Sequence, residues 1–141
     1  MITTLEQQLR RDEGEKLYAY KDSLGYMTIG VGRLIDLAKG GGITAEESAY
    51  LLANDIRDHT EGVLRLIPWS KSLDPVRFSV LVNMSFQLGL ATLLSFKNTL
   101  SFIQSGEYES AGANMVLSKW HEQTPARCER LARQMTTGVW Q

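Results

Sequence analysis

Apolar positions recur with a helical period along most of this chain of 141 residues. At its start, Leu5 and Leu9 lie four positions apart, which places both on one face of a helix. Thr3 or Thr4 can serve as the N-cap, with Glu6 or Gln7 closing a capping box. Gly14 is a natural C-terminal stop. The pattern predicts a first helix over residues 5–13.

Between residues 17 and 34 the pattern changes to that of β-strands. Aromatic and β-branched residues cluster here, and the segment "KDSLGY" has the composition of a polar turn that ends in glycine. We therefore expect a small antiparallel hairpin, the only convincing β segment of the chain. Strand alternation would place Tyr26, Thr28 and Gly30 on one face.

A long helix is predicted after the glycine-rich segment "AKGGG", which has the composition of a flexible connection. Thr44 and Glu47 form a capping box at its start, and apolar residues keep a helical period up to the stop at Pro68. A helix of more than twenty residues can connect two lobes or can be one long member of a bundle. The pattern alone leaves both possibilities open.

The rest of the chain reads as a cluster of helices. Asp74 and Pro75 are an N-cap and a first-turn proline, and the apolar segment that they open, ending at Gly89, is the best candidate for a buried central helix. Shorter helices are expected near residues 90–94, 99–104 and 108–117, and the pair Thr124 and Pro125 repeats the cap-and-proline pattern before a last helix to about Met135.

This order of elements predicts a mostly helical α+β fold with one domain, residues 1–141. A small β-containing N-terminal lobe would cover about residues 12–60. A larger helical C-terminal lobe would cover about residues 61–141 together with the first helix. A cleft between two such lobes is a preferred place for ligands.

Composition narrows the classes of function. A formal net charge of −1 and a pI near 6.1 give no overall signal of nucleic-acid binding. The N-terminal segment lacks the apolar core of a signal peptide, and no stretch is apolar enough to insert into a membrane. The single cysteine, Cys128, cannot form an internal disulfide. The two histidines, His59 and His121, form no zinc motif, and no P-loop is present, so we expect neither a metal nor a cofactor.

Two carboxylates are the candidate chemistry. Glu13 ends the first predicted helix, where the helix dipole disfavours a carboxylate charge, and this suits a general acid. Asp22 begins the polar turn, where backbone amides stabilise the ionised form, and this suits a base. Thr28, on the returning strand, is placed to help Asp22 hold a water molecule. Such a divided pair is typical of glycoside hydrolysis, although solvated acids at a helix end and a turn give the same spacing.

The same residues carry a resemblance to a known family. The segment "RRDEGEKLYAYKDSLGYMTIGVGRLI" closely resembles the catalytic segment of the phage-type lysozymes, the endolysin muramidases of glycoside hydrolase family 24. Its pattern is Glu, eight residues, Asp, five residues, Thr, then Gly-x-Gly. The segments "SLDPVRFSVLVNMSFQLG", "FKNTL" and "KWHEQTPARCERL" resemble later blocks of the family in the same order, so the likeness covers nearly the whole chain.

The resemblance implies a lysozyme-like fold and hydrolysis of the β-1,4 bond between N-acetylmuramic acid and N-acetylglucosamine in peptidoglycan. It assigns Glu13 as the general acid, Asp22 as the carboxylate that acts on water or supports the transition state, and Thr28 as the third catalytic residue. It also implies an inverting mechanism. Four further positions match residues that line the family's sugar-binding cleft: Leu34, Phe86, Thr99 and Asn114.

The resemblance further implies a monomeric endolysin with bacteriolytic, antimicrobial activity. It would wait in the host cytoplasm, act on the periplasmic cell wall, and depend on a holin-type partner that opens the inner membrane. A lytic transglycosylase and a non-catalytic peptidoglycan-binding module are the alternatives, and the intact acid pair with Thr28 argues against both. Two features depart from the family pattern: Arg33, where close members often have histidine, and the compact segment 35–44. A cluster at Arg127, Arg130 and Arg133 could either attract the anionic cell wall or form a solvated helix face.

Overall fold

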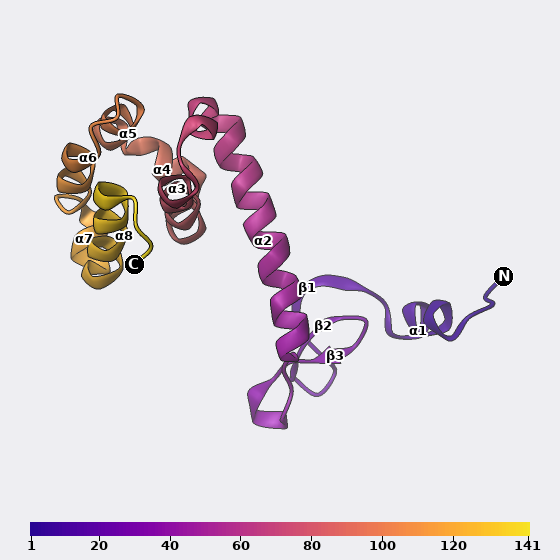
Figure 1. Cartoon of the computed structure of the whole chain (residues 1–141). Helices are drawn as coiled ribbons and strands as arrows, with labels where there is room; N and C mark the ends of the chain where they lie inside the picture. Colours follow the sequence, from indigo (N-terminus) through magenta and orange to yellow (C-terminus); the bar gives the residue numbers. More distant parts are fainter. The chain divides into compact units, whose positions relative to one another are not determined.

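The computed structural model describes all 141 residues and confirms a mostly helical α+β fold (Figure 1). Two compact units divide the chain, Met1–Leu51 and Leu52–Gln141, and their boundary falls inside a long helix. The elements in order are α1 (Leu5–Glu13), β1 (Lys16–Lys21), β2 (Met27–Gly30), β3 (Arg33–Leu34), the 3-10 segment η1 (Leu37–Lys39), α2 (Ala45–Leu66), η2 (Pro68–Ser72), α3 (Pro75–Leu88), α4 (Leu90–Ser95), α5 (Lys97–Gln104), α6 (Tyr108–Met115), α7 (Lys119–Gln123) and α8 (Pro125–Thr137).

The main helices begin where their capping residues predict. Thr4 accepts a hydrogen bond from the amide of Gln7 at 3.2 Å. Thr44 and Glu47 bond reciprocally, with Glu47 N 3.1 Å from Thr44 Oγ1 and Thr44 N 2.8 Å from a Glu47 carboxylate oxygen. At the start of α3, Asp74 accepts from the amide of Arg77 at 2.9 Å. Each bond satisfies amides that have no partner inside their helix.

The predicted hairpin is present and has a third strand. The sheet is antiparallel in the order β1-β2-β3, with Thr28 opposite Tyr20 on one side and opposite Leu34 on the other. The sequence did not predict β3, because the turn from β2 depends on positive φ angles at Gly30 and Gly32, 67° and 68°. Thr28 therefore lies at the centre of the sheet, and it is the one fully buried residue of Met1–Leu51.

The connection from β3 to α2 is structured, whereas its composition suggested a flexible segment. Asp36 organises it: one carboxylate oxygen accepts from the amide of Ala38 and the other from the amide of Met27, both at 3.0 Å. A Cβ at Gly41 would lie 2.8 Å from backbone atoms of Leu34 and Asp36. A single aspartate and a tightly packed glycine thus give this short segment a defined conformation against the sheet, which its composition did not predict.

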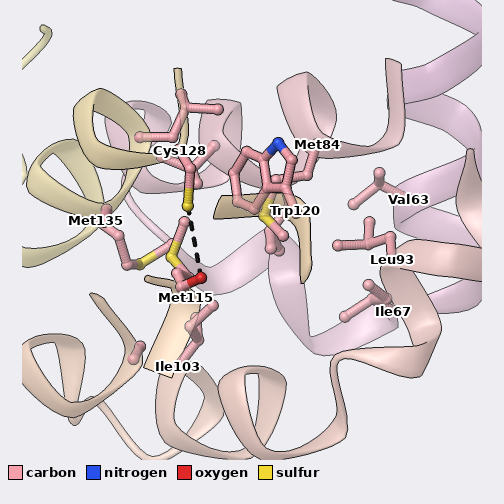
Figure 2. Packing of buried hydrophobic residues seen from close by; sticks show 14 residues of the cluster. Val63, Ile67, Met84, Leu93, Ile103, Met115, Trp120, Cys128 and Met135 are labelled. Carbon is pink, nitrogen blue, oxygen red and sulfur yellow. Dashed lines mark hydrogen bonds between the residues drawn. The ribbon is translucent and has the colours of Figure 1, made fainter. Parts of the chain in front are cut away.

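The hydrophobic core lies in the unit Leu52–Gln141 (Figure 2). The predicted central helix α3 supplies Val80, Leu81 and Met84, all completely buried. Met115 of α6 and Cys128 of α8 pack into the same cluster, and the Cys128 thiol lies 3.5 Å from the Met115 carbonyl oxygen (Figure 2). This core fixes the helices that carry the second group of candidate site residues.

Small residues let two pairs of helices approach closely. α6 packs along α8 at Gly112, where a Cβ would lie 2.9 Å from the carbonyl oxygen of Ala132. On α2, buried Gly62 leaves room for Leu90, whose side chain would lie 2.5 Å from a Cβ at that position. A larger residue at either glycine would force neighbouring atoms to move.

One predicted cap is wrong. Thr124 precedes α8, but its side chain caps no amide of that helix. Its hydroxyl instead accepts a hydrogen bond from the amide of Gln87 at 3.0 Å, and the oxygen of Gln87 accepts from the indole of Trp120 at 3.0 Å. A tertiary partner thus takes the oxygen that a local cap would use.

No helix of the chain combines the length and the apolar character that crossing a membrane requires.

Candidate active site

Asp22 lies in the turn that follows β1, and the turn holds one of its carboxylate oxygens. Oδ1 accepts hydrogen bonds from the backbone amides of Leu24 and Tyr26, both at 2.9 Å. This is the amide-stabilised aspartate that the polar turn predicted. The other oxygen, Oδ2, accepts no hydrogen bond from the protein. The turn therefore fixes the carboxyl group and leaves one of its oxygens free for a ligand or a water molecule.

Thr28 is joined to Asp22 through a single carbonyl group. The Thr28 hydroxyl donates to the backbone oxygen of Tyr26 at 3.0 Å, and the amide of Asp22 donates to the same oxygen at 2.9 Å. Only 4% of Thr28 is exposed, so its hydroxyl is held in one orientation inside the sheet. The catalytic threonine and aspartate suggested by the resemblance thus share one hydrogen-bond acceptor.

Glu13 is the last residue of α1, as predicted, and its carboxyl group lies beside Gly32. A Cβ at Gly32 would be 3.1 Å from Glu13 Oε2, and Gly32 has a φ of +68°. Glycine is therefore required there both by the backbone conformation and by the neighbouring carboxyl group. No side chain of the protein forms an ion pair with Glu13.

Leu34 completes the group of candidate residues in Met1–Leu51. It is half-buried in β3 and pairs directly with Thr28 of β2. Glu13 lies against Gly32, two positions before Leu34. Asp22 accepts a hydrogen bond from the amide of Tyr26, two positions before Thr28. The β2–β3 hairpin thus connects all four candidate residues of this unit.

In the unit Leu52–Gln141, Thr99 and Asn114 form a bonded pair. The Thr99 hydroxyl donates to the Asn114 side-chain oxygen at 2.6 Å, and Thr99 is only 1% exposed. That bond uses the amide oxygen, and the Asn114 NH2 group donates to no other group of the protein, so it remains available as a donor. Asn114 lines an open cavity of about 690 Å³ that is also bordered by Phe96 and Trp120.

Phe86 lies near the end of α3 with 42% of its surface exposed, so it is not a core residue. Its ring contacts the imidazole of His59 on α2, with ring centroids 5.0 Å apart and a tilt of 38°. Sequence reasoning examined His59 only as a metal ligand and missed this contact. The only signal in the sequence is that both residues fall on helices with an apolar face.

Comparisons with known proteins show the family to which this chain belongs. The family model for phage lysozymes matches residues 10–136. The chain is 32% identical over 165 aligned positions to a probable T4-type lysozyme of Dictyostelium discoideum, covering 99% of this chain and 97% of that protein. It is 32% identical to the endolysin of Salmonella phage P22, covering 79% of this chain and 78% of that protein. The chain belongs to the phage lysozyme family.

A third relative shows the same domain inside a larger protein. The pre-baseplate central spike protein of Enterobacteria phage T4 is 30% identical over 96% of this chain, which covers 28% of that protein. Membership in the family makes this protein a lysozyme-type hydrolase with a lysozyme-like fold.

In this lysozyme, Arg33 and Glu47 join the small sheet to the start of α2. Arg33 Nη1 lies 2.7 Å from the Glu47 oxygen that also accepts the capping bond from Thr44. The guanidinium hydrogen bond is the main cause that lowers the pKa of Glu47 to about 2, and the Thr44 amide adds to it. Arg33, which stands where close members of the family often have histidine, thus has a defined partner within its own unit.

The arginine cluster and the single cysteine form no hydrogen bond with a candidate residue. Arg127 donates twice to the Asn83 side-chain oxygen, at 3.1 and 2.6 Å, whereas exposed Arg130 and Arg133 form no ion pair. Burial raises the pKa of the Cys128 thiol to about 11, so the thiol stays protonated near neutral pH. No three His, Cys, Asp or Glu residues are grouped so as to hold a metal ion.

Proposed function

We propose that this lysozyme is a muramidase that hydrolyses the β-1,4 bond between N-acetylmuramic acid and N-acetylglucosamine in bacterial peptidoglycan. The observation that carries the proposal is the state of Asp22, whose Oδ1 is held by two amides while Oδ2 is free. A rigid carboxylate with one open oxygen is what a base needs to orient a water molecule. The peptidoglycan hydrolase of Pseudomonas phage phiKMV, 29% identical over 91% of this chain, supports the choice of polymer.

Glu13 and Asp22 divide the chemistry. Glu13 gives its proton to the glycosidic oxygen, so that the bond to the anomeric carbon breaks and the leaving sugar departs with a hydroxyl group. Asp22 accepts a proton from the water molecule whose oxygen forms the new bond to that carbon. The proton lost from Glu13 is balanced by the proton gained at Asp22, and exchange with solvent resets both groups.

The reaction proceeds with inversion of the anomeric configuration. Inverting glycosidases place their two carboxyl groups about 6.5–9.5 Å apart, so that the water molecule attacks the face opposite the leaving group. Glu13 comes from the end of α1 and Asp22 from the turn after β1, so the two carboxyl groups belong to different elements. Buried Thr28 serves as a positioning residue, because it holds the Tyr26 carbonyl that also anchors Asp22.

Three further side chains contact the sugars. Leu34 lies in the strand next to Thr28, Phe86 offers an exposed ring, and Asn114 has a free amide donor suited to the carbonyl of an N-acetyl group. Thr99 acts through Asn114, because it is buried and its hydroxyl fixes the amide orientation.

The biological role that fits this activity is that of a monomeric phage endolysin that lyses the host cell. The protein would remain in the host cytoplasm until a holin-type protein opens the inner membrane and gives it access to the periplasmic cell wall. The endolysin of Salmonella phage P22 among its relatives supports this role. Expression of the chain in a bacterium with and without a holin tests it, since lysis is expected only with the holin.

Clearing of purified cell walls tests the enzymatic proposal. The wild-type protein should reduce the turbidity of a peptidoglycan suspension, and Glu13→Gln should abolish clearing while the protein stays folded. Glu6→Gln on the same helix is the matched control, because Glu6 pairs only with exposed Arg10 at the surface. A Glu13→Gln variant with the wild-type rate would remove Glu13 from its role.

Mass spectrometry of the released fragments separates the proposal from its two alternatives. Hydrolysis gives muropeptides with reducing ends. Anhydro ends in their place would identify a lytic transglycosylase. Binding of the wild-type protein to cell walls without release of any fragment between pH 4 and pH 8 would identify a non-catalytic binding module.

A further inference from the structure

His59 contacts two consecutive residues of α3. Its Nδ1 atom lies 3.2 Å from the hydroxyl oxygen of Ser85, and its ring packs against that of Phe86 with centroids 5.0 Å apart. Ser85 is completely buried, whereas 42% of Phe86 is exposed. One side chain of α2 therefore links a fixed point of the core to an aromatic ring that faces solvent.

The hydrogen bonds define the orientation of the imidazole. A serine hydroxyl has one proton, and Ser85 donates it to the carbonyl oxygen of Val82 at 2.7 Å. Nδ1 of His59 must therefore carry a proton and donate to the Ser85 oxygen. The donation fixes the tautomer of the neutral ring with Nε2 unprotonated, and Nε2 has no hydrogen-bond partner in the protein.

We propose that His59 is a positioning residue that holds the ring of Phe86 as a platform for the apolar face of a sugar ring. This inference rests on the proposed function, because it takes the substrate to be a glycan that contacts Phe86. A half-exposed phenylalanine without a neighbour to hold it loses rotamer freedom when a ligand binds, and this entropy loss weakens binding. The contact with the anchored imidazole already restricts the ring of Phe86 in the free protein, so the ring loses less freedom when the substrate binds.

The arrangement needs both parts of the histidine side chain. The ring contact restrains Phe86 directly, since tilted aromatic pairs at this separation attract each other. The bond to buried Ser85 keeps the imidazole from turning away. A residue that supplies only one of these parts would leave the phenylalanine partly free.

Steady-state kinetics on soluble peptidoglycan fragments tests the inference. His59→Ala should raise KM by about 3- to 10-fold, the effect of losing one aromatic contact, with kcat unchanged within about twofold. His59→Asn keeps a donor for Ser85 but lacks the ring, and it should raise KM similarly. His59→Phe keeps a ring but has no donor for Ser85, so it should recover only part of the affinity. The control Glu61→Ala, at an exposed position on the same helix, should leave both constants unchanged.

A double-mutant cycle separates this inference from the proposed function. Phe86→Ala should raise KM, and adding His59→Ala to it should raise KM no further, because the platform is already lost. An unchanged KM in His59→Ala, or full additivity of the two substitutions, would overturn the role of His59 and leave the proposed function standing. An unchanged KM in Phe86→Ala would overturn the platform, while the result for Glu13→Gln would still decide whether the protein is a hydrolase.

Binding without turnover gives a second measurement. In the Glu13→Gln background, calorimetry with a tetrasaccharide of N-acetylglucosamine as the probe should show an affinity about 3- to 10-fold weaker when His59→Ala is added. Circular dichroism and thermal unfolding of each variant check that the fold is retained. Equal affinities in folded proteins would contradict the inference.

Discussion

The backbone amide of Asp22 and the hydroxyl of Thr28 both donate to the carbonyl oxygen of Tyr26, at 2.9 and 3.0 Å. Tyr26 in turn donates its own amide to the Asp22 carboxylate at 2.9 Å. The proposed base is thus held from two sides by one residue, and a buried threonine fixes that residue. A change at Thr28 should reach the chemistry through this carbonyl group.

Replacement of Thr28 tests the linkage. Thr28→Val keeps the shape but removes the hydroxyl, so the free energy of unfolding should fall by about 0.5–1.5 kcal/mol, the net value of one hydrogen bond. Because the turn that holds Asp22 is loosened, kcat should fall by about 10²-fold. Thr28→Ser retains the donor and should keep most of the activity. Equal rates for the valine and serine variants would show that the hydroxyl is not used.

Gly32 should be required for the placement of the general acid. Gly32→Ala forces a side chain into a φ of +68° and brings a Cβ to 3.1 Å from Glu13 Oε2. Gly40→Ala is the matched control, since its φ is +76° and no atom lies within 4 Å of the added Cβ. Both variants should lose about 1–2 kcal/mol of stability from backbone strain. Only Gly32→Ala should also lower kcat; equal kinetics in the two variants would contradict the contact.

The ion pair of Arg33 and Glu47 should give the fold an acid-dependent contribution to stability. The pKa of Glu47 is lowered to about 2 in the folded protein, against an ordinary value of 4.5. A lowered carboxyl pKa stabilises the fold above the unfolded value, and this contribution is lost as the pH falls from about 4.5 towards 2. Urea unfolding at pH 7 and pH 3 should therefore show a smaller decrease for Glu47→Gln than for the wild type. An identical decrease would show that the pair does not act in solution.

Cys128 should be unreactive in the native protein. Burial raises the pKa of its thiol to about 11, so almost no thiolate is present at pH 8. A thiol reagent should modify it only after unfolding by denaturant. Since the folded pKa lies above the unfolded one, the stabilising contribution is complete below the unfolded value and is lost as the pH rises towards 11. Rapid modification of the folded protein at pH 8 would contradict this burial.

Local signals account for most of what the sequence predicted correctly. The caps at Thr4, Thr44 and Asp74 lie next to the helices that they begin, and the structure confirms all three. The amides held by Asp22 are also within four residues of it. Interactions within one turn of chain depend on few residues, so composition and spacing are enough to find them.

Features that depend on distant partners were missed. The hydroxyl of Thr124 bonds to Gln87 instead of capping α8, and the exposed Phe86 meets His59 of another helix. The turn at Gly32 accommodates a carboxyl group from α1. Each of these depends on how separate elements pack, and no pattern along the chain encodes it. The assignment of the first helix to the C-terminal lobe, the catalytic roles and the sugar contacts remain predictions.

The stereochemistry of the first product tests the central claim most directly. If Glu13 protonates the leaving oxygen while Asp22 directs water to the opposite face, cleavage of a β-1,4 bond must first release the α-anomer of the new reducing end. Proton NMR of soluble peptidoglycan fragments, recorded within minutes of adding enzyme and before mutarotation, distinguishes the two anomers. We predict an initial α-anomer signal with the wild-type protein and no product with Glu13→Gln. Initial release of the β-anomer would contradict the account.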